Sequence, residues 1–417
     1  MVAEVVDVAG TERRVVSEGA SSTNMLRRSN ARLILNTIWR VPPGSTITAN
    51  ELIRSTSLTR ATVLGVCDDL LRDGWIVEAP ARTATGKGRP ARQFALDARA
   101  GFVIGIDAGY SGIRSVIANL RGELVGRGRA PFVADIDNPD PVPRTAALQR
   151  AIKSVLDDGG IDPRHVLSVC FGIPAPVSRR GTIPTGNPFW ERMAVDQAAV
   201  LAEHPQWMSF IENDANLAAL AERYNGTVDP DGSFLVLLAG ERFGAGIIED
   251  GHLLHGSLGG GGEMRYLDLV KGVGSPEAIA PLARAWAAEA IAAGRTTVLS
   301  QGRSEKNGPA AEAVFAAAAD GDAVAVEIVE RLAERLSHVI STLASLLNPD
   351  TVVIGGAVAP SIARLAEQIE AKVAATSHFP PRVVASSLAG DIVLTGAVNA
   401  ALARVGRDAL DIELRRG

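Results

Sequence analysis

A chain of 417 residues is too long for one small domain, and its length favours two or three. Its 47% of hydrophobic residues is an ordinary globular content, and its two cysteines, Cys67 and Cys170, exclude a disulfide framework and a four-cysteine zinc site. The net charge of −5 conceals an asymmetry, because residues 25–95 hold eleven Lys and Arg against five Asp and Glu. Only that segment suits a polyanion partner, although a solvated basic surface would show the same charge.

The first 24 residues are predicted to form a flexible tail. They lack the basic start and the apolar centre of a secretory signal. No stretch of the sequence approaches the roughly 20 apolar residues that a membrane helix needs. Since so few cysteines fit a reducing compartment, we expect a cytoplasmic protein without a membrane partner.

Residues 25–97 are predicted to form a winged helix-turn-helix. The pattern indicates three helices: Asn24–Trp39, a short helix through Arg54 that opens with a capping box at Thr48–Glu51, and a third from its N-cap Thr59 to Asp73, before Gly74. Leu26 and Leu33 are among the apolar residues at helical spacing in the first helix. Two short helices joined by a tight turn are typical of a motif whose second helix enters the major groove of DNA.

Two strands are predicted to follow, Trp75–Glu78 and Gln93–Leu96, with a basic, glycine-rich hairpin tip between them at residues 82–90. Such a wing could place an arginine in a minor groove. The expected contacts to double-stranded DNA are Thr59, Arg60 and Thr62 on the third helix, and Lys87 and Arg89 in the wing. The alternative is a three-helix protein-interaction domain with a mobile loop.

Residues 98–417 change to an α/β pattern. The predicted order is a strand at Phe102–Asp107, a turn at Ala108–Gly112, strands at Ser115–Leu120 and Glu123–Arg129, a helix at Arg144–Leu156 and a strand at Leu167–Ile173. This order is that of a ribonuclease-H-like lobe, two of which clasp a nucleotide in the actin and hexokinase superfamily. We expect one lobe at about 98–214 together with the C-terminal helix, and the other at about 215–395.

Six short motifs stand out along the chain: Leu58–Val63, Gly88–Pro90, Thr185–Trp190, Ile211–Asn216, Gly256–Glu263 and Val353–Gly356. In order and spacing they resemble the motifs of the ROK family (repressor, open reading frame, kinase), in particular its xylose-repressor and N-acetylglucosamine-repressor type, and the resemblance covers about residues 25–405. It implies a sugar site made of Asn187, Asn213, Asp214, Glu263 and Tyr266. Amide and carboxylate groups in a cleft do suit the hydroxyls of a sugar.

Two of these residues have plainer interpretations. Asn213 and Asp214 stand just before an expected helix at 215–223 and could simply cap it, and a cap and a ligand contact can coexist. Glu263 follows four glycines and could belong to a mobile surface loop. In a kinase of the family, Asp214 would be the general base.

The phosphate loops depart from the family's kinases. The first loop has Tyr110 in place of a glycine and lacks the lysine, and the second loop, Gly240–Gly244, carries Glu241 beside the position of a polyphosphate. The resulting repulsion argues against ATP, so no cofactor is expected and Asp214 is interpreted as a degenerate base without catalysis. The family's zinc site is also missing, since Glu263 is followed by Met264, Arg265 and Tyr266 rather than by a His and cysteines, and no metal is expected.

The sequence thus predicts a transcription regulator, more specifically a repressor, whose inactive kinase-like domain senses a sugar. A homo-oligomer, a dimer or higher, is expected through the Ala-rich helices between Glu277 and Leu347. One alternative is a ROK sugar kinase with a DNA-binding appendage. The other is a regulator that answers to a protein partner and has no small-molecule effector.

Overall fold

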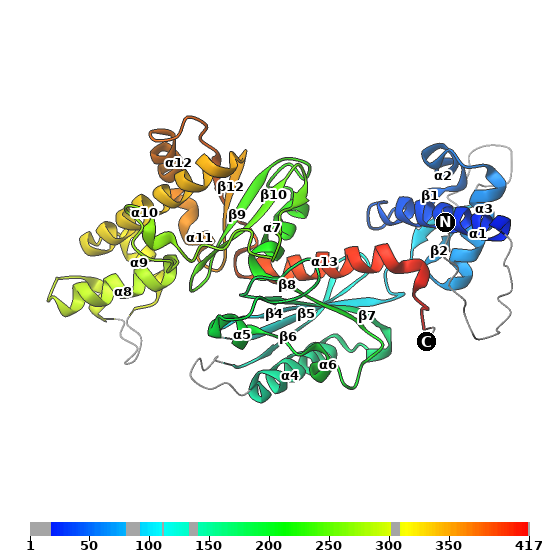
Figure 1. Cartoon of the computed structure of the whole chain (residues 1–417), viewed down its shortest axis with the longest axis horizontal. Coiled ribbons are helices and arrows are strands. Elements are labelled where there is room, and N and C mark those ends of the chain that lie inside the picture. Colours follow the sequence, from blue (N-terminus) through cyan, green and yellow to red (C-terminus); the bar gives the residue numbers. More distant parts are fainter. Residues whose placement is uncertain (1–17, 81–91, 111, 133–140, 302–308, 416–417) are drawn as a thin grey trace, which may run out of the picture. The chain divides into compact units, whose positions relative to one another are not determined.

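The computed structural model describes residues 18–80, 92–110, 112–132, 141–301 and 309–415. The chain divides into two compact units, and the first combines Met1–Ala100 with Gly406–Gly417. The second unit is Gly101–Val405 (Figure 1). No helix among the described residues is long and apolar enough to cross a membrane.

The first unit is a small helical domain with a three-stranded sheet. Its elements are α1 (Glu18–Trp39), β1 (Ile47–Thr48), α2 (Ala49–Thr56), α3 (Arg60–Asp73), β2 (Ile76–Ala79) and β3 (Gln93–Leu96). The strands lie in the order β1-β3-β2 and all pairs are antiparallel. The predicted wing residues 82–90 lie outside the described residues. The succession of α2, a short turn, α3 and two antiparallel strands is consistent with the predicted winged helix-turn-helix.

Local capping rules explain where α2 and α3 begin. Thr48 accepts the N–H of Glu51 while the Glu51 carboxylate accepts the N–H of Thr48, so the predicted capping box is confirmed. Thr59 accepts the N–H of Thr62 at 3.3 Å as the N-cap of α3, and Gly74 ends that helix with a φ of 86°. The sequence and the backbone therefore agree on the placement of α3.

The long first helix differs from its prediction. It begins at Glu18 rather than near Asn24, so the predicted tail at residues 1–24 is too long. Leu26 and Leu33 are 64% and 44% exposed, because they do not share the helix face that buries Ile34 and Ile38 in the core. Helical spacing alone did not reveal which apolar residues face the core.

The C-terminal segment, Gly406–Gly417, belongs to the first unit, whereas all of residues 98–417 were predicted to form the ROK-like domain. The turn Ala409–Asp411 contacts α1, and Asp411 forms an ion pair with Arg28. Nothing in the local sequence signals a contact between residues so far apart in the chain.

The second unit contains two five-stranded sheets of the same topology. The first sheet has the order β6-β5-β4-β7-β8, with β4 (Phe102–Ala108), β5 (Ile113–Asn119), β6 (Leu124–Ala130), β7 (Val166–Ile173) and β8 (Met208–Asn213). The second has the order β11-β10-β9-β12-β13, with β9 (Phe234–Ala239), β10 (Phe243–Glu249), β11 (His252–Leu253), β12 (Thr351–Gly355) and β13 (Arg382–Ala385). In each, an antiparallel three-stranded meander is extended by two parallel strands. This repetition confirms the two ribonuclease-H-like lobes.

Helices cover both faces of the first sheet. α4 (Val142–Gly159) packs against β5 and β6, and α13 (Ile392–Asp408) crosses the opposite face (Figure 1). Gly105 of β4 permits this approach, because a Cβ atom there would lie 2.9 Å from the carbonyl oxygen of Leu394. The short helices α5 (Pro188–Met193) and α6 (Gln197–Val200) lie between β7 and β8 in the chain.

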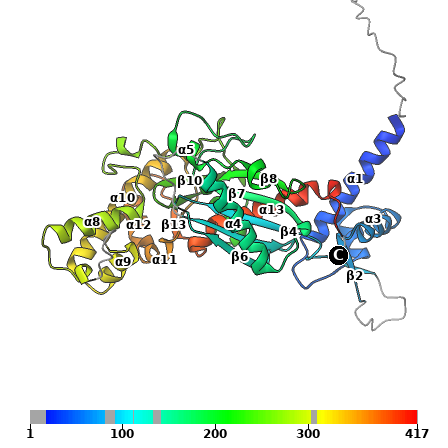
Figure 2. The same cartoon turned by 90° about the horizontal axis from the view of Figure 1, so that it is seen from below.

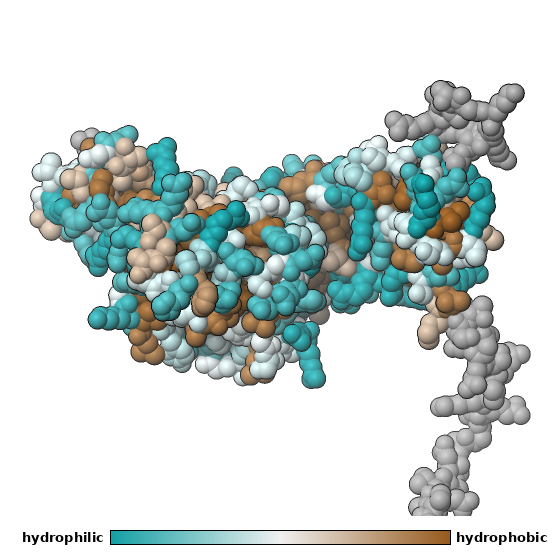
Figure 3. All heavy atoms as spheres, turned by 90° about the horizontal axis from the view of Figure 1, so that it is seen from above, coloured by the Kyte–Doolittle hydropathy of each residue, from teal (hydrophilic) through white to brown (hydrophobic). Residues whose placement is uncertain are grey.

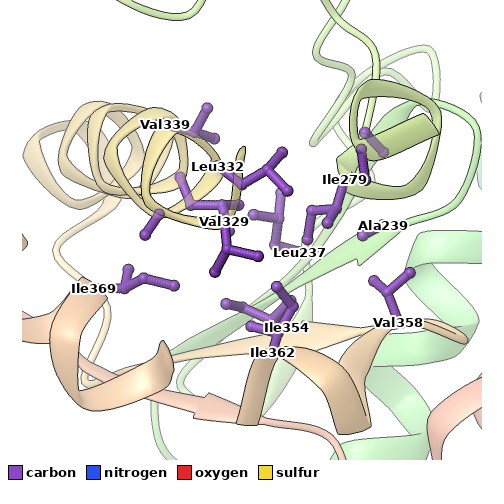
Figure 4. Packing of buried hydrophobic residues seen from close by; sticks show 14 of the residues in the cluster. Leu237, Ala239, Ile279, Val329, Leu332, Val339, Ile354, Val358, Ile362 and Ile369 are labelled. Atoms are coloured by element: carbon purple, nitrogen blue, oxygen red, sulfur yellow. The ribbon is translucent and has the colours of Figure 1, made fainter. Parts of the chain in front are cut away.

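The second sheet packs on α7 (Asp214–Asn225) with one face and on a group of helices with the other. The group comprises α8 (Ile279–Ala292), α9 (Ala311–Ala319), α10 (Ala323–Leu347), α11 (Ala359–Ile362) and α12 (Ala366–Ala374), most of which can be seen together in Figure 2. Leu237 and Ile354 of the sheet meet Leu332 and Ile369 of the helices in a continuous apolar core (Figure 4). Polar and apolar residues are interspersed on the face drawn in Figure 3.

Candidate functional site

The junction of β8 and α7 carries Asn213 and Asp214. The side-chain oxygen of Asn213 accepts the N–H of Asn216 at 3.0 Å, and its amide nitrogen donates to the carbonyl oxygen of Ala175 at 3.1 Å. The first of these hydrogen bonds makes Asn213 the N-cap of α7, as the plainer interpretation predicted. The Asn213 side chain is also buried. Its hydrogen bonds fix the place of the next residue, Asp214.

Asp214 is the first residue of α7, and its environment favours the protonated form. Desolvation raises the pKa of Asp214 to about 8, and the negative charges of Asp107 and Glu263 add to the shift. The structure therefore brings together two of the residues predicted for the sugar site, Asp214 and Glu263, and places Asp107 near them. A carboxyl group that titrates near neutral pH can accept or donate a hydrogen bond to a hydroxyl.

This pKa has a consequence for stability. An unfolded chain ionises Asp214 near its ordinary pKa of 3.8, whereas the folded chain holds the proton up to about pH 8, so the parent loses stability as the pH rises between these values. Asp214→Asn does not titrate. We expect the free energy of unfolding of Asp214→Asn, relative to that of the parent, to rise by on the order of 3 kcal/mol between about pH 5.5 and about pH 8. Thermal unfolding at both pH values checks this, and a difference that stays constant with pH would contradict it.

Glu263 ends a glycine-rich segment that is held in place by the backbone. Residue Glu263 pairs with Gly244 of β10, and the Ala245 N–H donates to the carbonyl oxygen of Gly262 at 3.0 Å. Gly262 has a φ of 84°, and a Cβ atom there would lie 1.7 Å from the carbonyl oxygen of Ala245. The glycines are thus required for a close backbone approach, and the mobile-loop alternative is wrong for this end of the segment.

The surroundings of Glu263 leave its side chain open to solvent, yet the protein atoms that crowd it raise its pKa through desolvation. Among the described residues, no group of three His, Cys, Asp or Glu side chains could hold a metal ion. Glu263 and Asp214 each offer a carboxyl group that can form hydrogen bonds with a ligand.

A half-buried pair next to this site was not predicted from the sequence. The Nε2 atom of His255 lies 3.0 Å from Glu212, whose other oxygen accepts the side-chain amide of Asn216 at 2.9 Å. The hydrogen bond to Glu212 raises the pKa of His255. Glu212 lies within the Ile211–Asn216 motif, so its place was known, but no spacing rule connects it with His255.

The first loop of the kinase signature is held by two arginines. Arg114 forms an ion pair with Asp107 at 2.6 Å, although burial still raises the pKa of Asp107. The buried Arg144 donates to the carbonyl oxygens of Ala108 at 2.6 Å and Gly109 at 3.3 Å. The carboxylate at the start of this loop is therefore already paired within the protein.

One side chain from each of the two phosphate loops lies against the ring of Phe189. The rings of Tyr110, from the first loop, and Phe189, from α5, have centroids 6.1 Å apart. Arg242, from the second loop, lies over the same Phe189 ring at 6.0 Å. Asn187 positions this ring, because its side-chain oxygen caps α5 by accepting the N–H of Phe189 at 3.0 Å. A continuous contact thus links the two loops.

Glu241 was expected beside a polyphosphate and Tyr266 in the sugar site, but both side chains have other neighbours. Glu241 forms an ion pair with Arg284 of α8 at 3.3 Å. Tyr266 is 67% exposed, and the guanidinium of Arg265 lies over its ring at 5.7 Å. Its ring therefore contacts a neighbouring arginine and is largely open to solvent.

The N-terminal turn of α3 carries the expected DNA contacts that the structure describes. Thr59 and Thr62 share a hydrogen bond of 3.0 Å between their hydroxyls, and Arg60 donates to the side chain of Asn50 in α2 at 3.1 Å. Thr59 and Arg60 are exposed, and Thr62 is half-buried. Lys87 and Arg89 lie outside the described residues, so their role stays a prediction.

Comparison with known proteins decides the family. The profile of the ROK family matches residues 103–404, which is most of the chain. The chain belongs to the ROK family. Its ROK domain coincides with the second unit, and the predicted resemblance is confirmed.

Relatives of two kinds share this ROK domain. A xylose repressor of Caldicellulosiruptor bescii is 24% identical over 342 residues, which cover 79% of this chain and 84% of that protein. A glucokinase of Halalkalibacterium halodurans is 31% identical over 273 residues, which cover 61% of this chain and 80% of the enzyme.

Solved structures divide in the same way. A ROK-family transcriptional regulator, a homologue of the Escherichia coli Mlc protein, matches with a TM-score of 0.68 at 21% identity and covers 90% of this chain. The match covers 96% of the regulator's own chain. A Streptomyces griseus glucokinase in complex with glucose and AMPPNP matches with a TM-score of 0.58 at 23% identity, covering 72% of this chain and 99% of the enzyme. At these identities the likeness shows the fold, and the regulator's fold extends over more of this chain.

Proposed function

We propose that this protein is a DNA-binding transcription regulator, a repressor acting in the cytoplasm, whose ROK domain senses a sugar or sugar derivative without phosphorylating it. The observation that carries the proposal is the unit before the ROK domain, with α2, α3 and the three-stranded sheet. The regulator structure covers 90% of the chain, whereas the glucokinase structure covers 72%. A kinase needs no such unit, whereas a helix-turn-helix reads DNA.

The absence of catalysis rests on the two loops. Phosphoryl transfer requires the loops to approach the phosphates closely and to neutralise their charge. Here Tyr110 and Arg242 converge on Phe189, and Asp107 is engaged by Arg114. Asp214 and Glu263 remain available for hydroxyl groups. Recognition of a sugar is thus supported more strongly than recognition of a nucleotide.

A sugar kinase with a DNA-binding appendage is the competing function. The glucokinase relative at 31% identity favours it, and a carboxyl group with a pKa of about 8 would suit a general base. The test is incubation of the full chain with ATP, Mg²⁺ and a panel of pentoses, hexoses and N-acetylhexosamines. We expect no phosphorylated sugar. Turnover that is lost in Asp214→Asn would establish the kinase instead.

Contact of α3 with DNA gives a direct prediction. Arg60→Ala should weaken binding to a selected operator by about 1–3 kcal/mol, because it removes a guanidinium from the N-terminal turn of the helix that enters the groove. Arg72→Ala, at the other end of α3 and paired with Asp69, is the matched control and should bind as the parent does. Fluorescence anisotropy with labelled DNA measures both, and equal losses in the two variants would sink the assignment of α3.

The proposed regulator acts as a homo-oligomer, since helix-turn-helix proteins read paired half-sites as two-fold dimers. The Ala-rich helices were expected to form the interface between subunits. Ala283 and Ala287 of α8, however, are buried in the core of the chain itself. We still expect light scattering at micromolar concentration to give at least twice the 43.6 kDa of one chain. A mass of one chain would contradict this.

A further inference from the structure

Three arginines share one face of the first sheet of the ROK domain. Arg114 of β5 stands directly opposite Asp107 of β4 and directly opposite Arg129 of β6. Arg127 precedes Arg129 by two residues on the same strand, so both side chains leave the same face. Like charges opposite each other in a sheet are unfavourable unless an anion lies between them.

The carboxylates of the chain compensate only part of this charge. Asp391, just before α13, lies 3.4 Å from Arg114 and 2.9 Å from Arg127. Arg114 also holds Asp107 and donates to the carbonyl oxygen of Gly390. The side chain of Arg129 is exposed and has no hydrogen-bond or ion-pair partner among the described residues. Within the part of the chain that the structure describes, one of the three guanidinium groups is therefore unpaired, and the other two share Asp391.

These groups line a hollow of about 390 Å³. Its walls are the three arginines, Asp391, Ser115, Gly128, Ser154 and Leu394. Guanidinium groups present paired N–H donors in a planar fork that matches the oxygens of phosphate. A phosphate dianion bound here would balance Arg129 and relieve its repulsion with Arg114.

We propose that this hollow is a second ligand site of the ROK domain, which binds the phosphate group of a small phosphorylated metabolite through Arg129, Arg127 and Arg114. It goes beyond the proposed sensing of a sugar, because it recognises a phosphate rather than hydroxyl groups. The two sites are neighbours through Arg114, which donates both to Asp391 in the hollow and to Asp107 near Asp214.

Calorimetry on the full chain tests the proposal at constant ionic strength. The probes are inorganic phosphate, a sugar phosphate and malonate. We expect saturable binding of one phosphate group per chain, at least about tenfold weaker in Arg129→Gln, a change that removes no ion pair or side-chain hydrogen bond among the described residues. Arg127→Gln should weaken it similarly. Arg164→Gln is the matched control, since Arg164 is an exposed arginine paired with Asp162 outside the hollow.

The outcomes separate the possibilities. Binding of the sugar phosphate more tightly than inorganic phosphate identifies a phosphorylated metabolite, and the reverse order identifies phosphate itself as the ligand. Binding of malonate alone, equal binding by parent and Arg129→Gln, or no saturable binding of either phosphate probe would overturn the proposal. None of these results depends on DNA binding, so failure here and failure of the proposed regulator function are distinguishable.

Discussion

Asp214→Ala is expected to bind operator DNA as tightly as the parent chain and to remain bound when the sugar that releases the parent is added. The residue belongs to the ROK domain, so its loss leaves α3 unchanged. Removing the carboxyl group leaves a sugar hydroxyl without its partner in the site, which costs about 1–3 kcal/mol, so the variant should need roughly 5–150 times more sugar. Asp107 and Glu263 lie close enough to Asp214 for their charges to raise its pKa, so three carboxyl groups meet at this site.

The measurement is anisotropy of labelled DNA, selected by the parent from a random library and titrated with a sugar panel. Asp157→Ala is the matched control, because Asp157 is an exposed aspartate of α4 that pairs with Lys153. A parent-like response of Asp214→Ala to the active sugar would place the sensor elsewhere. Equal loss of response in Asp157→Ala would show a general effect of removing an aspartate.

Gly262→Ala should have the largest effect on the fold of the site. Its Cβ atom would lie 1.7 Å from the carbonyl oxygen of Ala245, at a φ of 84° that side chains rarely adopt. Relief requires the strand contact at Gly244 and Glu263 to open. We expect a loss of more than about 3 kcal/mol in the free energy of unfolding of the ROK domain, with loss of the sugar response.

Gly260→Ala is the control for this change. It lies two residues earlier in the same segment, and a Cβ atom there has no neighbour within 4 Å. Denaturant unfolding should therefore separate a strongly destabilised Gly262→Ala from a nearly unchanged Gly260→Ala. Similar stabilities for the two variants would mean that the segment is not held against β10 as described.

Features with local causes could be predicted from the sequence. The capping box at Thr48 and Glu51, the N-cap Thr59 and the stop at Gly74 each depend on residues within one turn, and the structure has all of them. The order of strands and helices in the ROK domain also follows from local hydrophobic patterns. From that order follow two lobes, each with the same arrangement of five strands.

Contacts between distant residues could not be predicted. Arg114 and Asp391 are separated by 277 positions, and Glu212 and His255 by 43, so no spacing rule connects them. The same holds for Arg28 and Asp411, whose pair brings the C-terminal segment into the first unit. Asp214 and Glu263 could each be predicted as site residues from their motifs. The raised pKa of Asp214 depends on its burial and its neighbours, which only the fold provides.

Equilibrium binding of the full chain to its selected DNA, measured with each sugar of the panel in turn, shows whether a sugar controls DNA binding. We expect tight binding without sugar and at least a tenfold loss of DNA affinity with one sugar or a small related group, in the absence of ATP. Affinity for DNA that no sugar changes, or no sequence-specific binding at all, would contradict it.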